Sequence, residues 1–168
     1  MVPNPYTLLS EIPERAKYFS VIDLKDAFYS VPLVGGSQFL FAFQDLMQPA
    51  SQLTWAVLPQ GFRDSPHLFG QSLSPDLQNF NSSEAMVLSY VNDIFLCVEA
   101  KEACSRASED FLNFLAGCGY KASREKAQLC QQSVRYLGLI TSEETWAIGP
   151  ERIKPILNYP LPMTLIEL

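Results

Sequence analysis

Short runs of apolar, β-branched and aromatic residues recur along the chain, and polar or turn-forming residues bound each run. This pattern predicts strands at residues 18–22, 39–43, 53–57, 86–90, 94–98, 134–140 and 146–148. Residues 44–52 separate the second and third runs and predict a hairpin loop. The fourth and fifth runs flank Asn92 and Asp93, which is the pattern of a tight β-hairpin.

The spacing of apolar residues changes to a helical period over residues 65–80. Ser65 is expected to cap this helix, with Pro66 at the first helical position, where the missing N–H removes no hydrogen bond. Pro75 lies inside the pattern. Because proline lacks the backbone donor and crowds the preceding turn, continuing the helix through it costs about 3 kcal/mol, and we predict a kink or a break there.

A second helix is predicted over residues 101–118, where apolar side chains form one stripe and Gly119 follows as a stop. One turn of helix is expected near residues 6–9, and residues 149–168 have the proline-punctuated pattern of a tail. The order of strands, hairpins and helices predicts an α+β domain in which helices cover one face of an antiparallel sheet.

The composition is that of a globular protein, with 48% hydrophobic and 18% charged residues, which argues against intrinsic disorder. The formal net charge is −6, whereas a free-standing nucleic-acid binder normally has the opposite sign. No basic and apolar leader opens the chain, and the longest apolar stretch, 85–98, is too short to cross a bilayer. We therefore expect an intracellular, by default cytoplasmic, protein that is neither secreted nor inserted in a membrane.

Cysteine spacing argues against a zinc site. Cys97, Cys104, Cys118 and Cys130 form no Cys-x-x-Cys pair, and His67 is the only histidine. Zinc sites need closely spaced thiolate and imidazole ligands. Scattered buried thiols in a reducing compartment are the expected state.

Two aspartates at the ends of apolar runs are the candidates for chemistry. Asp23 follows the run 18–22, and Asp93 lies in the turn before the run 94–98. Either aspartate alone is most often only a turn residue. Held together at the ends of neighbouring strands, two carboxylates can share a hard cation such as Mg²⁺ with the phosphates of a substrate. Phosphoryl-transfer enzymes clamp the attacking and leaving oxygens between two such ions.

Four motifs then occur in a fixed order: VIDLKDAF at 21–28, LPQGF at 58–62, YVND at 90–93 and YLG at 136–138. In this order they resemble retroviral reverse transcriptases, above all the gammaretroviral type and its endogenous copies, and the likeness covers residues 2–162. The resemblance implies a polymerase palm-like antiparallel sheet with helices on one face, plus a partial fingers hairpin.

The same resemblance implies a division of the chain. A partial reverse transcriptase domain would span residues 1–148, with fingers at about 1–17 and 36–60 and palm at about 18–35 and 61–148. Residues 149–168 would be a tail that leads toward a thumb and connection absent from this chain.

The resemblance also implies site residues, each at the matching position of this sequence. The catalytic and metal-binding positions match Asp23, Asn92 and Asp93. The positions around the incoming deoxynucleotide match Asp26, Phe28, Gln60, Gly61 and Lys126, with Phe28 pressing on a ribose 2′-hydroxyl. The primer grip matches Tyr136, Leu137 and Gly138. Plainer interpretations stay open for some of these, namely Phe28 as core, Gln60 and Gly61 as a turn, and Lys126 as a solvated charge.

Asn92 departs from the family, which carries Tyr-x-Asp-Asp in this hairpin and uses the first of those aspartates as a metal ligand. An amide oxygen can coordinate Mg²⁺ but brings no charge, so the two Mg²⁺ ions of the ancestral enzyme would bind weakly or not at all. The loss of one carboxylate is expected to lower the rate on the order of 10³-fold.

Two hypotheses follow from the resemblance. The chain is a fragment of an RNA-directed DNA polymerase, whose ancestor acted on RNA/DNA primer-template and deoxynucleotides, and it is inactive and binds nucleic acid weakly as it stands. The alternative is a non-catalytic endogenous-retrovirus remnant, either unselected or acting as a protein-binding module. Asn92, Pro75 and the expected lack of a thumb favour inactivity, and association with other Pol-derived proteins is a further expectation.

Overall fold

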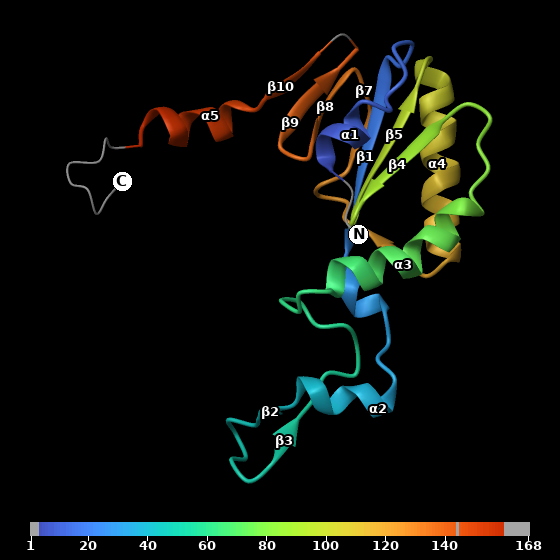
Figure 1. Cartoon of the computed structure of the whole chain (residues 1–168). Coiled ribbons are helices and arrows are strands. Elements are labelled where there is room, and N and C mark those ends of the chain that lie inside the picture. The colour runs from blue at the N-terminus through green and yellow to red at the C-terminus, as the bar shows by residue number, and fades with distance from the viewer. Residues whose placement is uncertain (1–3, 144, 160–168) are drawn as a thin grey trace.

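Figure 1 shows the computed structural model, which describes residues 4–143 and 145–159. The helices are α1 (Pro5–Leu9), η1 (Ala27–Ser30), α2 (Gly35–Gln38), η2 (Phe39–Phe41), α3 (Ser65–Gln78), α4 (Lys101–Gly117) and α5 (Pro150–Leu157), where η denotes a 3₁₀ helix. The strands are β1 (Tyr18–Lys25), β2 (Phe43–Gln44), β3 (Gln52–Leu53), β4 (Met86–Tyr90), β5 (Asp93–Val98), β6 (Lys121–Ala122), β7 (Gln128–Gln131), β8 (Ser133–Tyr136), β9 (Leu139–Ser142) and β10 (Trp146–Ile148). The part of the predicted tail beyond Tyr159 lies outside the described residues.

The central sheet is antiparallel and is built around β1. Its strand order is β4-β5-β1-β6, and β7 also pairs with β1. β1 runs to Lys25 and does not end at Asp23 as predicted, because β6 pairs with Leu24 and Lys25 and so extends the strand.

Alternate side chains of this sheet enter two separate cores. On one face, Ile22 and Ile94 pack with the buried side chains of α3 and α4. On the other face, Phe19 and Phe95 pack with α1 and with β8 and β9 of the second sheet, whose order is β10-β9-β8. The predicted α+β class and the placement of two helices on one face are confirmed. The cover of the opposite face was not predicted, since it depends on contacts between segments far apart in the sequence.

Residues 33–57 form an arm that extends away from the body of the protein (Figure 1). The predicted strand at 39–43 is wrong, because α2 and η2 occupy residues 35–41 and only Phe43 and Gln44 are extended. The predicted strand at 53–57 shrinks in the same way to β3 and an isolated bridge at Val57. The hairpin between them is confirmed, with Phe43 opposite Leu53. Apolar runs here do not form long strands because the arm offers no neighbouring sheet to pair with.

Of the kink or break predicted at Pro75, the break is wrong, since α3 continues to Gln78, and the kink stays a prediction. Pro75 lies in the last turn of the helix, so its missing N–H removes one hydrogen bond close to the end, where few helical hydrogen bonds remain to be formed. The Asn79 side chain supports this turn, because its Nδ2 donates to the Pro75 carbonyl at 3.1 Å. The N-cap is Asp64 and not Ser65. Ser65 is instead buried, and its hydroxyl donates to the Pro59 carbonyl at 2.7 Å.

The predicted strand at 134–140 is divided into β8 and β9. Leu137 and Gly138 adopt φ of 52° and 75°, which closes a two-residue turn between Tyr136 and Leu139. Positive φ at both central residues is the signature of a type I′ hairpin, whose twist matches that of the strands. Residues 150–157, predicted as part of a tail, form α5, which extends from the body on the left of Figure 1.

The cysteines are all free thiols. Cys97 and Cys104 are buried as expected, Cys130 is half-buried and Cys118 is exposed, so the expectation of burial fails for Cys118. Over residues 4–143 and 145–159, no group of three or more His, Cys, Asp or Glu side chains is placed to hold a metal ion. The helices in the same ranges all lack the length or hydropathy needed to cross a membrane.

Candidate functional site

The register of the central sheet places the two predicted catalytic carboxylates opposite each other. β1 and β5 pair antiparallel, with Asp23 directly across from Asp93. Because side chains alternate along a strand, both aspartates lie on the sheet face that carries Phe19 and Phe95. The predicted adjacency of Asp23 and Asp93 is therefore confirmed.

The turn that holds Asp93 is tight and strained. Tyr90 pairs with Asp93, which leaves Val91 and Asn92 as a two-residue loop. Val91 has φ of 54°, a conformation that a β-branched residue rarely adopts. The Leu24 N–H donates to the Asn92 carbonyl at 2.8 Å and ties the turn to β1. Strain of this kind persists only where neighbouring contacts hold it, and it is frequent at functional sites.

The Asp23 carboxylate has two partners in the site. Asn92 Nδ2 donates to Asp23 Oδ2 at 3.2 Å, and Lys126 Nζ lies 3.2 Å from Oδ1 and 3.4 Å from Oδ2. The Asp23 side chain is only 15% exposed, whereas that of Lys126 is 68% exposed. The Ser123 N–H donates to the Asp23 carbonyl at 2.8 Å and holds the segment that carries Lys126 against β1. Lys126 thus partly neutralises Asp23.

Burial and the neighbouring carboxylate both act on Asp93. Burial is the larger cause that raises the pKa of Asp93 above its usual 3.8, and the negative charge and hydrogen bonding of Asp23 raise it further. The positive charge of Lys126 acts in the opposite direction. The Tyr136 hydroxyl donates to the Asp93 backbone carbonyl at 3.5 Å and connects the predicted primer grip to this strand. The raised pKa of Asp93 shows that its negative charge is unfavourable beside Asp23, and a bound cation would relieve this repulsion.

The predicted substrate residues gather around one cavity of about 610 Å³ on the Asp23 side. Its lining includes Asp23, Asp26, Phe28, Gln60, Asn92 and Lys126. Phe28 is half-buried and also packs edge-on against Phe69, so it serves the core and the cavity together. Gly61 does not line the cavity; with φ of 88° it forms the turn that follows Gln60.

Asp93 lines a second cavity, of about 450 Å³, whose lining does not include Asp23. The other residues that line it are Pro5, Tyr6, Tyr90, Leu137, Gly138, Leu139 and Arg152. Two of the three predicted primer-grip residues are therefore at its surface, and Tyr136 is buried behind them. Arg152 and Tyr6 were missed, because one lies in a segment with the pattern of a tail and the other near the N-terminus, and neither belongs to a motif.

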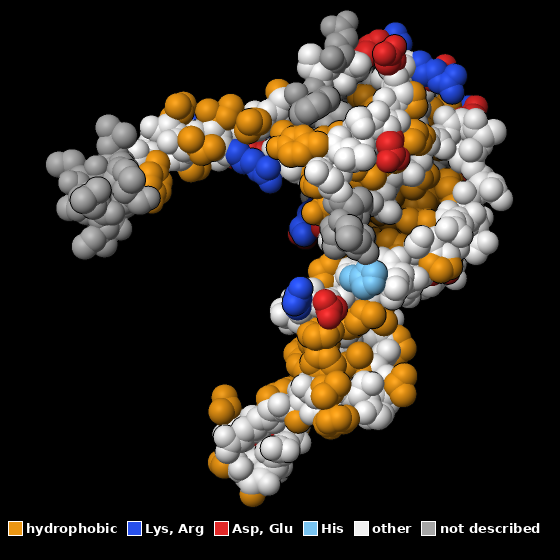
Figure 2. All heavy atoms as spheres, viewed as in Figure 1, with side chains coloured by type: hydrophobic (Ala, Val, Ile, Leu, Met, Phe, Trp, Pro, Cys, Tyr) orange, Lys and Arg blue, Asp and Glu red, His pale blue; other side chains and the backbone are white. Residues whose placement is uncertain are grey.

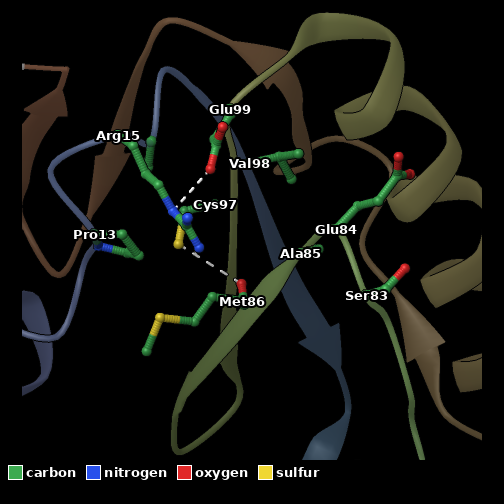
Figure 3. Close-up of a pocket in the computed structure, with 10 residues that line it drawn as sticks. Pro13, Arg15, Ser83, Glu84, Ala85, Met86, Cys97, Val98 and Glu99 are labelled. Atoms are coloured by element: carbon green, nitrogen blue, oxygen red, sulfur yellow. Dashed lines mark hydrogen bonds and ion pairs between the residues drawn. The ribbon is translucent and has the colours of Figure 1, made fainter.

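A third cavity lies at the other end of the β4–β5 hairpin and does not contain the carboxylates (Figure 3). It measures about 240 Å³. Arg15 Nε pairs with Glu99 at 2.7 Å beside it, and the Cys97 thiol donates to the Met86 carbonyl at 3.7 Å. Burial raises the pKa of Cys97 to about 12, which makes this cysteine a packing residue and not a nucleophile.

The donor set at the paired strands suits one hard divalent ion better than two. Asp23, Asn92 and Asp93 offer oxygen ligands of the kind that Mg²⁺ prefers. Only the two aspartates carry charge, for a formal total of −2 against +4 for a pair of divalent ions. The amide of Asn92, moreover, is already engaged with the carboxylate of Asp23.

Comparison with known proteins agrees with this geometry. Residues 6–141 match the family described as reverse transcriptase (RNA-dependent DNA polymerase). The chain is 45% identical to the Gag-Pol polyprotein of avian reticuloendotheliosis virus over 97% of its length, and 46% identical to the Pol polyprotein of feline endogenous virus ECE1 over 96%. It spans only 15% and 16% of those polyproteins.

Solved structures give the same assignment. The foamy viral protease-reverse transcriptase in complex with an RNA/DNA hybrid matches 99% of this chain with a TM-score of 0.84 and 29% identity, over 22% of its own length. The form in complex with double-stranded DNA matches equally well, at a TM-score of 0.84. The four ordered motifs, the paired aspartates and the sheet around them thus have one common explanation: the chain belongs to the reverse transcriptase family.

Proposed function

We propose that this chain is the fingers and palm portion of an RNA-directed DNA polymerase, and that it does not measurably extend a primer as it stands. The observation that carries the proposal is the register of Asp23 opposite Asp93 between two cavities of nucleotide size. Polymerases of this kind add a deoxynucleotide to a primer 3′ end by phosphoryl transfer, in which positioning and charge stabilisation supply most of the rate enhancement. The chain spans only 15% of the avian polyprotein that it matches, so we propose the polymerase activity for the longer protein and not for this segment alone.

The two cavities divide the substrates between them. The cavity of about 610 Å³ has Lys126, Lys25 and Arg124 in its lining, which suits the triphosphate of an incoming deoxynucleotide. Phe28 in the same lining supplies the bulk that would exclude a 2′-hydroxyl. The cavity of about 450 Å³ has the turn of Leu137 and Gly138, which suits the primer terminus. Asp23 and Asp93 stand between the two substrates.

Asp23 and Asp93 are the residues that would hold Mg²⁺, with the oxygen of Asn92 as a neutral third ligand. When bound in polymerases, divalent ions neutralise charge on the attacking and leaving oxygens. Asn92 removes one formal charge from this site, and we expect the resulting loss of rate to be on the order of 10³-fold. Weak binding of nucleic acid is expected in addition, because the net charge of −6 opposes phosphate contacts.

An exposed apolar surface favours a second candidate, namely a protein-binding module. Phe39, Leu40, Leu46 and Met47 on the arm are between 67% and 90% exposed. Figure 2 shows hydrophobic side chains along this arm. Surfaces of this kind commonly mark protein interfaces. Association with other Pol-derived polypeptides would cover them without requiring catalysis.

A primer-extension assay with four proteins tests the proposal. They are the native chain, its Asn92→Asp variant, and both sequences grafted in place of the corresponding segment of a complete gammaretroviral polymerase. The template is a homopolymer with an annealed primer, and labelled deoxynucleotide is supplied with Mg²⁺ or Mn²⁺. We expect no extension by either isolated chain, and clear extension by the Asn92→Asp graft at a rate on the order of 10³-fold above the native graft.

Each contrary result has a distinct meaning. Robust synthesis by the native chain or the native graft would show that Asn92 serves as an adequate ligand and would refute the proposed inactivity. An Asn92→Asp graft that folds but stays silent would refute the polymerase assignment of this site and leave the protein-binding module as the supported function.

A further inference from the structure

The guanidinium of Arg152 lies directly over the turn between β8 and β9. A Cβ atom built on Gly138 would overlap the Arg152 guanidinium, so the two groups are in close contact. Gly138 therefore has two reasons to be glycine: its φ of 75°, and the space taken by Arg152. Arg152 lies in the first turn of α5, and its side chain contacts the β8–β9 turn while the helix itself extends outward (Figure 1).

The charge of Arg152 is available to a ligand. Its neighbour Glu151 pairs with Arg135 of β8 at 3.8 Å, which helps to anchor the start of α5. By contrast, across residues 4–143 and 145–159 no carboxylate lies within ion-pair distance of Arg152. An unpaired guanidinium at a cavity is an efficient phosphate ligand, because its planar donors match two phosphate oxygens at once.

The cavity next to Arg152 has the size and chemistry for the end of a nucleic-acid strand. At about 450 Å³ it falls within the range of small-ligand sites. Asp93 lies at one part of its lining and Arg152 at another, so the cavity offers a catalytic carboxylate and a phosphate ligand.

We propose that Arg152 binds a backbone phosphate of the primer strand close to its 3′ end, and so acts as a positioning residue for the primer terminus beside Asp93. This inference rests on the proposed polymerase function and adds to it a phosphate ligand from outside the four family motifs. Arg152 would act together with the Gly138 turn, whose lack of a side chain lets the guanidinium approach the cavity.

The test measures how tightly the full chain binds a labelled template with a recessed primer, by fluorescence anisotropy at about 20 mM salt, where phosphate contacts contribute most. Arg152→Gln is compared with Arg152→Lys and with Lys154→Gln, a matched control that removes the same charge from α5 outside the cavity. A second series replaces each of the last primer phosphates, one at a time, with an uncharged methylphosphonate.

Arg152→Gln is expected to weaken binding about 5-fold and to reduce the salt slope by about one, with Lys154→Gln changing affinity less than about 2-fold. Arg152→Lys should retain part of the affinity. One methylphosphonate near the 3′ end should weaken the native chain about 5-fold and leave Arg152→Gln almost unchanged, because the contact is already lost.

Equal effects of Arg152→Gln and Lys154→Gln would overturn the inference. So would a methylphosphonate penalty that is the same with and without Arg152, or no binding of the primed template at about 20 mM salt. Failure of the proposed polymerase function would show in a different assay, as an Asn92→Asp graft that folds but does not extend a primer.

Discussion

Replacing Asn92 by aspartate is expected to destabilise the metal-free protein while increasing its response to Mg²⁺. The native amide donates a hydrogen bond to Asp23 Oδ2 at 3.2 Å, and the variant places a third carboxylate at the same point. The change therefore removes an attraction and adds a repulsion in a site where Asp23 is only 15% exposed. A divalent cation reverses both effects, because it is attracted to every added negative charge.

The magnitude follows from these contacts. Loss of a hydrogen bond to a charged acceptor costs about 1.5 kcal/mol at the low end of the measured range. Repulsion between carboxylates about 4 Å apart is about 4 kcal/mol at an effective dielectric of ~20, before Lys126 and side-chain rotation reduce it to an estimated ~1.5 kcal/mol. The sum of about 3 kcal/mol corresponds to a decrease in Tm of about 6–12 °C. A Kd of ~0.1 mM for Mg²⁺ would restore about 2.7 kcal/mol at ~10 mM.

Thermal melts followed by circular dichroism, in EDTA and in MgCl₂, measure both effects. Asn81→Asp is the matched control, since Asn81 lies in an exposed loop and the chemical change is identical. The control should melt within about 2 °C of the native chain in either buffer, because exposed surface substitutions change stability little. A variant at position 92 that is as stable as the native chain in EDTA, or that gains no more from MgCl₂ than the native chain, would refute the geometry argued for this site.

Two further predictions concern stability. Asp93→Asn should raise Tm at pH 7 in EDTA, because it removes a carboxylate whose charged form is unfavourable in the folded state. Since the folded-state pKa of Asp93 is raised, the native chain regains this stability as pH falls toward 3.8. A difference in Tm that does not shrink on acidification would contradict the raised pKa of Asp93. Pro75→Gln should raise the free energy of unfolding by about 1 kcal/mol, because glutamine restores the backbone donor to the Gln71 carbonyl inside a helix that already continues to Gln78. An unchanged urea midpoint would show that Pro75 does not destabilise the helix.

Local patterns in the sequence determined much of the central body. Short continuous runs of apolar, β-branched and aromatic residues before Asp23 and after Asp93 identified the two central strands, because such runs bounded by polar or turn residues are typical of buried strands. Helical periodicity identified α4, whose apolar stripe is buried against the sheet. The motifs around Asp23, Asn92 and Asp93 gave the family, which the comparisons confirm.

Only the tertiary structure decided what these elements face. The arm residues 39–43 carry the same apolar composition as a strand, yet residues 39–41 form a helical turn and only Phe43 pairs with another strand, because the central sheet does not lie beside them. Asp23 and Asp93 are 70 positions apart in the chain, and strand register sets them side by side but on two separate cavities. Arg152 lies outside every motif, and it reaches the Gly138 turn only because α5 begins where the second sheet ends. Periodicity reports which face of an element is buried, whereas the identity of the partner depends on long-range packing that no local pattern contains.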